Sequence, residues 1–433
     1  MRKVKFQSPT GMSDILPEKQ DYFKKIYEVV SDMADFYRFG KIDTPIVEET
    51  ELFSKGIGAA TDIVKKQMYS FRTKGGDFLT LRPEGTPPIV RSYIENGMQT
   101  LPQPVKLWYF GPFFRYERPQ AGRYRQFWQF GFEVLGEGNS VIDAQIIQIF
   151  YNILNGLKLK NLIVEINSIG DNQCRPYYKK LLSSYFRTRE ASLCSDCKRR
   201  LKENVLRILD CKEEKCQAIK AEAPQILDHL CEQCNLHFKE VLEFLDEVEI
   251  PYNLNPYLVR GLDYYTKTVF EVFSDVNKKE ENIEGNVKRL ALGGGGRYDK
   301  LVKLLGGRET PGCGAAAGME RIITLIKKQN IEFQKSVDTQ IFLAQLGSLA
   351  KRKSLKLLDD LRRAKVRVAE SFGRDSLKAQ LNRADHIGVK YTLVFGQKEA
   401  LEETIIIKDM VSGKQTVVKL DNVVEEMKKR LKR

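Results

Sequence analysis

The segment 111–136, GPFFRYERPQAGRYRQFWQFGFEVLG, carries the strongest structural signal in this chain. Two aromatic runs, WYFGPFF (108–114) and FWQFGFEVL (127–135), have the length and composition of β-strands. Pro119 and Gly122 lie between the runs and predict a hairpin loop. A half-buried hairpin does not need arginines, yet four fall in this segment: Arg115, Arg118, Arg123 and Arg125. Guanidinium groups match phosphate oxygens as two-pronged donors, and aromatic rings offer faces for stacking, so the hairpin predicts a polyanion site.

The residues on either side of the hairpin predict an antiparallel α+β core. Apolar residues recur at helical spacing in 20–37 and 141–157, and strand patterns joined by turns precede and follow them. Residues 172–250 differ, because they are rich in charge and cysteine, helical in pattern and without strand-like runs. We interpret them as a helical insertion. The core resumes in the segments 257–273, 290–302 and 312–328, the last of which has the pattern of a small-residue strand that enters a helix.

The pattern changes again near the C-terminus. Polar residues 329–337 are interpreted as a linker that ends the core domain, residues 1–328. In 338–433, strand and helix patterns alternate, as in α/β domains, and we expect a separate domain with a largely parallel sheet.

The bulk properties narrow the class of protein. The formal charge of +14 and the pI near 9.2 favour an anionic partner such as nucleic acid, although a basic solvated surface explains the same numbers. The N-terminus lacks the apolar segment of a signal peptide, and no run approaches the roughly 18 apolar residues of a membrane span. We therefore expect a cytoplasmic protein without membrane contact. Its eight cysteines would then be thiols or metal ligands rather than disulfides.

Three further segments place polar residues beside strand patterns. LRPEGT (81–86) sets Glu84 and Thr86 on a bent loop, which could also be an ordinary turn before a helix. VRGLDYYTKTVFEV (259–272) carries Arg260, Asp263, Tyr264 and Tyr265, although an edge strand with solvated charge would look similar. In GMERIITL (318–325), Arg321 falls in a helix, where an arginine is usually solvated, although the small residues before it permit close approach of a ligand.

Through these segments the chain resembles the histidyl-tRNA synthetase family of class II aminoacyl-tRNA synthetases. PTGMSDILP opens the resemblance, TPIVEETELF resembles the first class II motif, and LRPEGT with the arginine hairpin resembles the second. RGLDYYTKTVFEV is similar to the histidine-specific signature, and GGRYDKL and AAAGMERIITL complete the resemblance. It runs through nearly the whole chain. It implies a class II antiparallel-sheet catalytic core and a C-terminal α/β anticodon-binding domain.

The implied reaction joins L-histidine to the 3′ end of tRNA(His) through a histidyl-adenylate, with ATP and Mg²⁺ entering as a complex. Because two anions must meet in the first step, fixed cations should dominate the site. The resemblance assigns Arg115 and Arg260 to the α-phosphate and Arg321 to the γ-phosphate. It assigns further ATP contacts to Glu117, Arg123 and Phe127, with Phe127 stacking on adenine.

Histidine recognition needs partners for the ammonium group and both ring nitrogens. The residues that match the family's histidine pocket are Glu84, Thr86, Gln129, Glu133, Tyr264, Tyr265 and Tyr298. Which of the two glutamates meets the ammonium and which the imidazole stays open. The resemblance also places Arg118 and Gln120 at the tRNA acceptor end, and it implies a homodimer with an interface near Pro45. In the C-terminal domain, tRNA contacts would draw on Arg362, Arg363, Lys365, Arg367, Arg374 and Lys378.

Two other functions fit part of the sequence. A non-catalytic histidine-binding paralogue, such as the regulatory subunit of ATP phosphoribosyltransferase, resembles the same core. The intact RGLDYY, the three arginines and the C-terminal domain favour the enzyme. A nucleic-acid-binding module would explain the charge but not the Glu84 and Tyr264 segments.

The insertion contains two CxxC pairs. Cys194 with Cys197 and Cys231 with Cys234 could together bind a structural Zn²⁺, although 33 residues separate the pairs. Cys211 and Cys216 could join this site or form a second one. Reduced cysteines in a helical insertion are the alternative.

Overall fold

The predicted hairpin forms and lies within a large sheet, next to its short edge strand β1 (Gly40–Lys41). β5 (Val105–Phe114) and β6 (Gln126–Leu135) pair antiparallel along their full length. Successive residues of β6 point to opposite faces of the sheet, as in any strand. Phe130 and Phe132 are buried in the main hydrophobic core, whereas Gln129 lies on the opposite face. The even-numbered residues of β6 therefore pack in the core, whereas its odd-numbered residues face the other side of the sheet.

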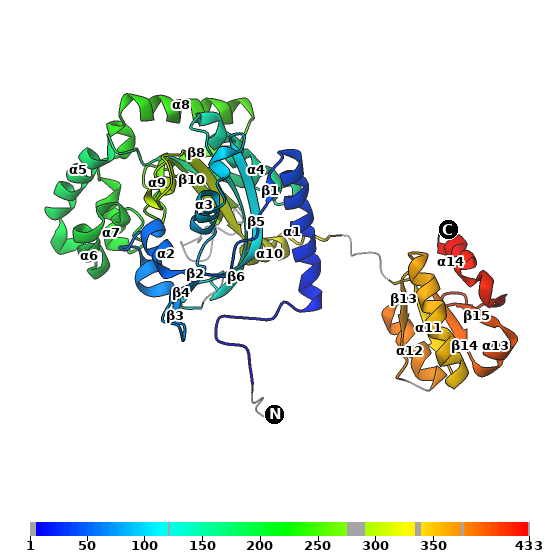
Figure 1. The fold of residues 1–433 in the computed structure, drawn as a ribbon. Coiled ribbons are helices and arrows are strands. Elements are labelled where there is room, and N and C mark those ends of the chain that lie inside the picture. The colour runs from blue at the N-terminus through cyan, green and yellow to red at the C-terminus, as the bar shows by residue number, and fades with distance from the viewer. Residues whose placement is uncertain (1–5, 120–121, 275–290, 334–338, 374–375, 432–433) are drawn as a thin grey trace. The chain divides into compact units, whose positions relative to one another are not determined.

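The computed structural model describes residues 6–119, 122–274, 291–333, 339–373 and 376–431. It divides into two compact units, Met1–Phe333 and Gln334–Arg433 (Figure 1). The linker expected at 329–337 falls partly outside the described residues. Within its described part, Phe333 packs edge-on against Tyr22 of the first unit at 6.2 Å between ring centroids.

The first unit is built on an eight-stranded sheet. Its inner strands pair antiparallel, and each edge strand pairs in parallel with its neighbour. In order across the sheet the strands are β1 (Gly40–Lys41), β5, β6, β11 (Gly312–Gly318), β10 (Ala291–Arg297), β9 (Thr266–Ser274), β7 (Leu162–Ser168) and β8 (Tyr252–Leu254). This arrangement confirms the predicted antiparallel α+β core.

Helices pack on the sheet through two separate cores. One core joins even-numbered residues of β6 to α1 (Pro17–Phe36), α4 (Ser140–Gly156), α8 (Glu232–Glu247) and α10 (Met319–Lys328). The other core joins the opposite face to α3 (Thr86–Glu95) and the short α9 (Leu301–Leu304). α2 (Thr50–Ile57) has its own small cluster with the π-helical turn Ile63–Gln67. A small sheet completes the unit, with strand order β2 (Val47–Glu49), β4 (Phe78–Leu81) and β3 (Tyr69–Arg72).

A buried ionic cluster ties the sheet to two helices. Arg297, at the end of β10, is fully buried and forms an ion pair with Asp143 of α4. His237 of α8 lies 3.3 Å from the same carboxylate, and the carbonyls of Glu137 and Asn139 accept from the guanidinium at 3.0 Å each. Because a buried charge is tolerated only when it is paired, this cluster fixes the end of β10 and the residue that follows, Tyr298.

The segment expected as an insertion is helical. Its last helix, α8, packs in the core of the large sheet, so the separate part is shorter than the expected 172–250. The remaining elements are α5 (Arg175–Arg187), α6 (Ser195–Glu203), α7 (Glu214–Ala221) and the 3-10 turns Glu190–Ser192, Val205–Ile208 and Ile226–His229. These elements enclose a hydrophobic core of their own, which includes Cys197, Cys211 and Cys216.

The second unit is α/β, but its sheet is mixed rather than largely parallel. The strand order is β13 (Val368–Glu370), β12 (Ile341–Gln345), β14 (Tyr391–Phe395), β15 (Thr404–Asp409) and β16 (Gln415–Lys419). β12 pairs in parallel with β13 and β14, whereas β14–β15 and β15–β16 are antiparallel. Residues 396–403 join β14 to β15 and residues 410–414 join β15 to β16, and both connections are shorter than the dozen or so residues that a parallel crossover needs, so the prediction was wrong here. The helices are α11 (Ser348–Arg363), α12 (Leu377–Ile387), α13 (Gln397–Glu402) and α14 (Val423–Leu431).

Within the part of the chain that the structure describes, no helix is both long and apolar enough to span a membrane.

Candidate active site

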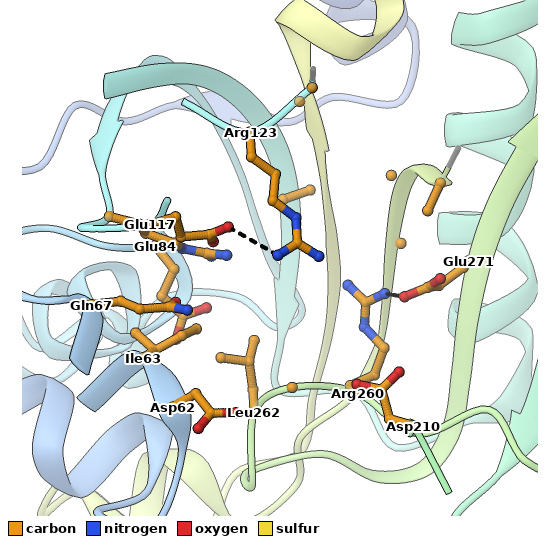
Figure 2. A pocket seen from close by; sticks show the side chains of 18 of the residues that line it. Asp62, Ile63, Gln67, Glu84, Glu117, Arg123, Asp210, Arg260, Leu262 and Glu271 are labelled. Atoms are coloured by element: carbon orange, nitrogen blue, oxygen red, sulfur yellow. Dashed lines mark hydrogen bonds and ion pairs between the residues drawn. The ribbon is translucent and has the colours of Figure 1, made fainter. Parts of the chain in front are cut away.

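A pocket of about 580 Å³ opens on the face of the large sheet that carries Gln129. The hairpin, the loop before α3, the segment before β9, the start of α10 and the insertion all contribute to its walls (Figure 2). It gathers residues from every segment singled out in the sequence. Those that line it are Glu84, Thr86, Arg115, Glu117, Arg123, Phe127, Gln129, Arg260, Tyr264, Tyr265 and Arg321.

Glu84 lies in the buried wall of the pocket, and one of its two carboxylate oxygens accepts a hydrogen bond. The Tyr264 hydroxyl donates to its Oε2 at 2.8 Å, while the buried Oε1 has no hydrogen-bond partner among the described residues. Burial raises the pKa of Glu84 to about 7, against the opposing effects of the Tyr264 hydrogen bond and of Arg115 and Arg260. Because an unpaired buried carboxylate oxygen is costly, this atom is suited to accept a hydrogen bond from a ligand.

Glu133 is buried beside this wall, and both of its oxygens are engaged. The Thr86 hydroxyl donates to Oε1 at 2.7 Å, and the Tyr298 hydroxyl donates to Oε2 at 2.5 Å. β11 approaches so closely that a β-carbon at Gly314 would lie 1.7 Å from Oε2, and only glycine fits there. Burial raises the pKa of Glu133 to about 8, and Glu84 raises it further against the two hydroxyl bonds. Glu133 and Tyr298 are absent from the pocket lining.

Backbone carbonyls and a carboxylate hold the three arginines in separate positions. Arg115 donates from Nε to the Pro83 carbonyl at 2.9 Å, and its guanidinium lies 5.4 Å from the centre of the Phe127 ring. Arg321 donates to the carbonyls of Gly122 at 3.1 Å and Ala291 at 2.9 Å. Burial and then the charge of Arg123 lower the pKa of Arg321. These contacts orient cations toward the pocket before any anion is bound.

Arg260 is fixed by an ion pair with Glu271 of β9 (Figure 2). Burial acts to lower the pKa of Arg260, but Glu271 and the two tyrosines Tyr265 and Tyr264 outweigh it, so the pKa is raised. Glu271 is a pocket residue that the sequence did not single out, although it is a charged residue within the otherwise apolar run VFEVF.

Two arginines of the hairpin loop, Arg123 and Arg125, make different kinds of contact. Arg123 lies 3.5 Å from the Glu117 carboxylate at the mouth of the pocket and is 47% exposed (Figure 2). Arg125 instead braces the loop, because it donates to the Glu117 carbonyl at 3.2 Å and stacks 4.0 Å above the Tyr116 ring. Arg118 is exposed and does not line the pocket, and Gln120 lies outside the described residues.

The insertion forms a wall of the pocket, which the sequence did not predict. Arg207 donates to the Gly261 carbonyl at 2.9 Å and to the Asp62 carboxylate at 3.1 Å. Asp62 and Asp210 also line the pocket (Figure 2). These residues come from segments far apart in the sequence, and no local pattern links them.

The two CxxC pairs do not share a site. Cys194 and Cys197 cluster with Cys211 and Cys216, whereas Cys231 and Cys234 cluster with Asp171 and Cys174. The expected joint site of Cys194, Cys197, Cys231 and Cys234 is therefore wrong. The chain after α6 turns back through Val205–Ile208, so nearer cysteines take the positions that the sequence assigned to the distant pair.

The buried Glu133 predicts a pH dependence of stability. Its folded pKa of about 8 lies above its ordinary value, so its contribution to stability is full below about pH 4.5 and is lost as pH rises through about 8. The Tm of Glu133→Gln should therefore fall less than that of the wild type between about pH 6 and pH 9. Thermal unfolding by circular dichroism measures this. The exposed Glu243→Gln should keep the wild-type slope, and parallel curves for Glu133→Gln would refute the burial argument.

Known proteins resemble the chain over nearly its full length. A family model described as histidyl-tRNA synthetase matches residues 11–322, and one described as anticodon binding domain matches residues 340–430. A protein named histidine–tRNA ligase from Dehalococcoides mccartyi is 43% identical and covers 98% of this chain and 100% of its own. One of the same name from a Geobacillus species is 42% identical, with 98% and 99% covered.

Solved structures agree with the sequence relatives. The crystal structure of apo histidyl-tRNA synthetase from S. aureus superposes with a TM-score of 0.80 at 36% identity, and the match covers 97% of this chain and 99% of that one. A Bacillus halodurans protein described as an ATP phosphoribosyltransferase regulatory subunit/histidyl-tRNA synthetase shares the fold, with a TM-score of 0.62 at 19% identity. By the family models, the relatives and the fold, this chain belongs to the histidyl-tRNA synthetase family.

Proposed function

We propose that this chain ligates L-histidine to the 3′ end of tRNA(His) in two steps. Histidine and ATP first give histidyl-adenylate and pyrophosphate, and the histidyl group then passes to the tRNA with release of AMP. The observation that carries the proposal is the pairing, in one pocket, of the unpartnered Glu84 oxygen with three arginines held apart by the protein. Such a pocket would accept an ammonium group at the carboxylate and a polyphosphate at the arginines. Proteins named histidine–tRNA ligase at 43% identity support the same function.

In the first step the protein must bring two anions together. The histidine carboxylate attacks the α-phosphorus of ATP, and pyrophosphate leaves as the bond to the β-phosphate oxygen breaks. Arg115 and Arg260 would lie on either side of the reacting oxygens, where fixed cations stabilise the developing charge most effectively. Arg321, near the hairpin loop, would hold the γ-phosphate. ATP arrives with Mg²⁺, which neutralises part of the phosphate charge.

The hairpin would bind the nucleoside. Phe127 offers an aromatic face to adenine, and the guanidinium of Arg115 lies over the same ring. Glu117 and Arg123 form an ion pair at the mouth of the pocket and would contact the nucleotide there. Because Arg123 is nearly half exposed, we expect it to reposition when ATP binds.

The two glutamates have different roles in the proposed histidine site. Glu84, with its free oxygen, would accept from the substrate ammonium, together with Thr86 and Gln129 in the lining. Tyr264 and Tyr265 would flank the side chain. Glu133 holds Thr86 and Tyr298 in place, and it reaches the imidazole only if one of these hydroxyl bonds is exchanged.

The second unit and the hairpin tip would contact tRNA. The family model for anticodon binding covers 340–430, and Arg362 and Arg363 at the end of α11 are each 72% exposed. Lys365, Arg367 and Lys378 add positive charge, while Arg374 lies outside the described residues. Arg118 and Gln120 are assigned to the acceptor end. A cytoplasmic location is proposed because tRNA is charged there.

The non-catalytic paralogue remains the rival function. It would bind histidine in the same pocket but would have no use for the three arginines or for an anticodon-binding unit. Amino-acid-dependent exchange between ATP and pyrophosphate separates the two, because histidine binding alone produces no exchange.

Exchange should require Arg260. We expect histidine, and no other standard amino acid, to support ATP–pyrophosphate exchange, and Arg260→Ala to reduce it about 100- to 1,000-fold, as loss of a group that stabilises transition-state charge does. Arg260→Lys should recover part of the rate, because it keeps the charge but not the planar fork. Arg187→Ala on the exposed side of α5 serves as the control. Near-normal exchange in a folded Arg260→Ala variant would refute the assigned role.

A homodimer is proposed through the small sheet. Pro45 precedes β2, and three large apolar side chains of this region are exposed: Ile46 at 44%, Phe71 at 43% and Phe78 at 50%. Ile46 and Phe78 are the two that we assign to the interface, because exposed large apolar side chains are typical of protein interfaces. Sedimentation equilibrium should give about twice the chain mass of 49.8 kDa, and Ile46→Glu with Phe78→Glu should reduce it to one. A wild-type monomer would contradict the proposal.

A further inference from the structure

The insertion contains a cluster of four cysteine sulfurs that the proposed reaction does not use. The Sγ atoms of Cys194, Cys197, Cys211 and Cys216 all lie within 4.8 Å of one another, and those of Cys194 and Cys211 are 3.9 Å apart. Four thiolates around a tetrahedral Zn²⁺, with Zn–S near 2.3 Å, are separated by about 3.8 Å. The four sulfurs therefore already have nearly the spacing of a coordination shell.

The surroundings of this cluster favour thiolate sulfur. The backbone N–H of Cys197 donates to the Cys194 sulfur at 3.4 Å, and that of Cys194 donates to the Cys216 sulfur at 3.3 Å. Cys194 also caps α6, so its sulfur lies at the positive end of a helix. N–H donors and a helix N-terminus both stabilise negative charge on sulfur. Ordinary buried thiols would need neither.

A second cluster of possible metal ligands lies at the base of the insertion and shares no residue with the first. Asp171, Cys174, Cys231 and Cys234 also place their ligand atoms within 4.8 Å of one another. The Asp171 Oδ1 lies 3.6 Å from the Cys174 sulfur and 3.9 Å from the Cys231 sulfur. A tetrahedral Zn²⁺ with one carboxylate oxygen and three sulfurs gives oxygen–sulfur separations of about 3.6 Å. Here too the CxxC pair begins a helix, with Cys231 at the cap of α8.

We propose that each cluster binds one Zn²⁺, and that the two ions fix the insertion as a wall of the active pocket. Binding converts the thiols to thiolates and releases their protons to solvent, and no electron is transferred. We choose zinc because it favours tetrahedral coordination by sulfur ligands alone or by sulfur with one oxygen. Its structural sites are also closed and need no open coordination position.

The first ion would act on the pocket through Arg207. Cys194 and Cys211 line the pocket themselves, and Arg207 lies on the turn between Cys197 and Cys211. Its guanidinium holds the Gly261 carbonyl, next to Arg260. Metal binding at both ends of this turn would keep Arg207 in place and thereby position Arg260.

The second ion would act through Arg175, the residue after Cys174. Arg175 donates to the carbonyls of Ile169 at 3.1 Å, Gly170 at 2.9 Å and Tyr265 at 2.6 Å. It thus joins the end of β7 to a tyrosine of the proposed histidine pocket. This ion would hold the base of the insertion on the core.

Metal content tests the two sites directly. Plasma mass spectrometry of the purified full chain, dialysed against a weak chelator, should give about two Zn²⁺ per chain. Cys194→Ser with Cys197→Ser and Cys231→Ser with Cys234→Ser should each lower this to about one, and the buried control Cys313→Ala should keep two. A wild-type protein without stoichiometric zinc overturns the proposal, whether its thiols are all free, oxidised to disulfides or bound to iron and sulfide. Zinc that stays at two in either double variant overturns that site.

The effect on the pocket rests on the proposed function and has a separate readout. In histidine-dependent exchange, the Cys194/Cys197 variant should raise the KM for ATP about tenfold or more, as loss of supporting contacts around a site does, with a smaller change in kcat. An unchanged KM in the variant that lacks the first zinc overturns the coupling to the pocket. Absence of exchange in the wild type would refute the proposed function, while the two zinc ions would still be found.

Discussion

The buried carboxylates Glu84 and Glu133 are the constraint around which the catalytic unit is arranged. Neither can be tolerated in an apolar interior without partners, so hydroxyl groups from Thr86, Tyr264 and Tyr298 surround them. These partners come from the start of α3, the segment before β9 and the end of β10. Satisfying the two acids therefore requires all of these segments to be in position, and it still leaves one Glu84 oxygen for a ligand.

The arginines of the pocket pose the complementary problem, because several cations must be held close together. Arg115, Arg260 and Arg321 would repel one another if they were free to move. Carbonyl groups and Glu271 fix each of them, so the positive potential exists before the substrate arrives. An amino acid at Glu84 and a nucleotide at the arginines would bring their reacting groups together beside the guanidinium groups. The same fixed side chains would thus orient the substrates and stabilise the charge that develops in the reaction.

Much of this arrangement could be predicted from the sequence, because its signals are local. The two strands of the hairpin, the odd and even faces of β6 and the antiparallel core all follow from patterns within a few residues. The same patterns could not show that Glu133 and Tyr298 lie outside the pocket lining, since that depends on the close approach of Gly314 from another strand. They could not pair the cysteines correctly or reveal Arg207 as part of a wall. Those features arise where the chain folds back on itself, and the spacing of residues along the sequence does not show where it does so.

If Glu84 receives the ammonium group of histidine, as proposed, its carboxyl should lose the proton that burial favours in the free pocket. Calorimetric titration with L-histidine, in buffers of different ionisation enthalpy, counts the protons exchanged on binding. Because burial raises the pKa of Glu84 to about 7, histidine binding at pH 7 should release a fraction of a proton from this carboxyl. Glu84→Gln, measured at histidine concentrations that saturate its weaker site, should lose this release, and Glu133→Gln should retain it. An unchanged proton count in Glu84→Gln would contradict the account.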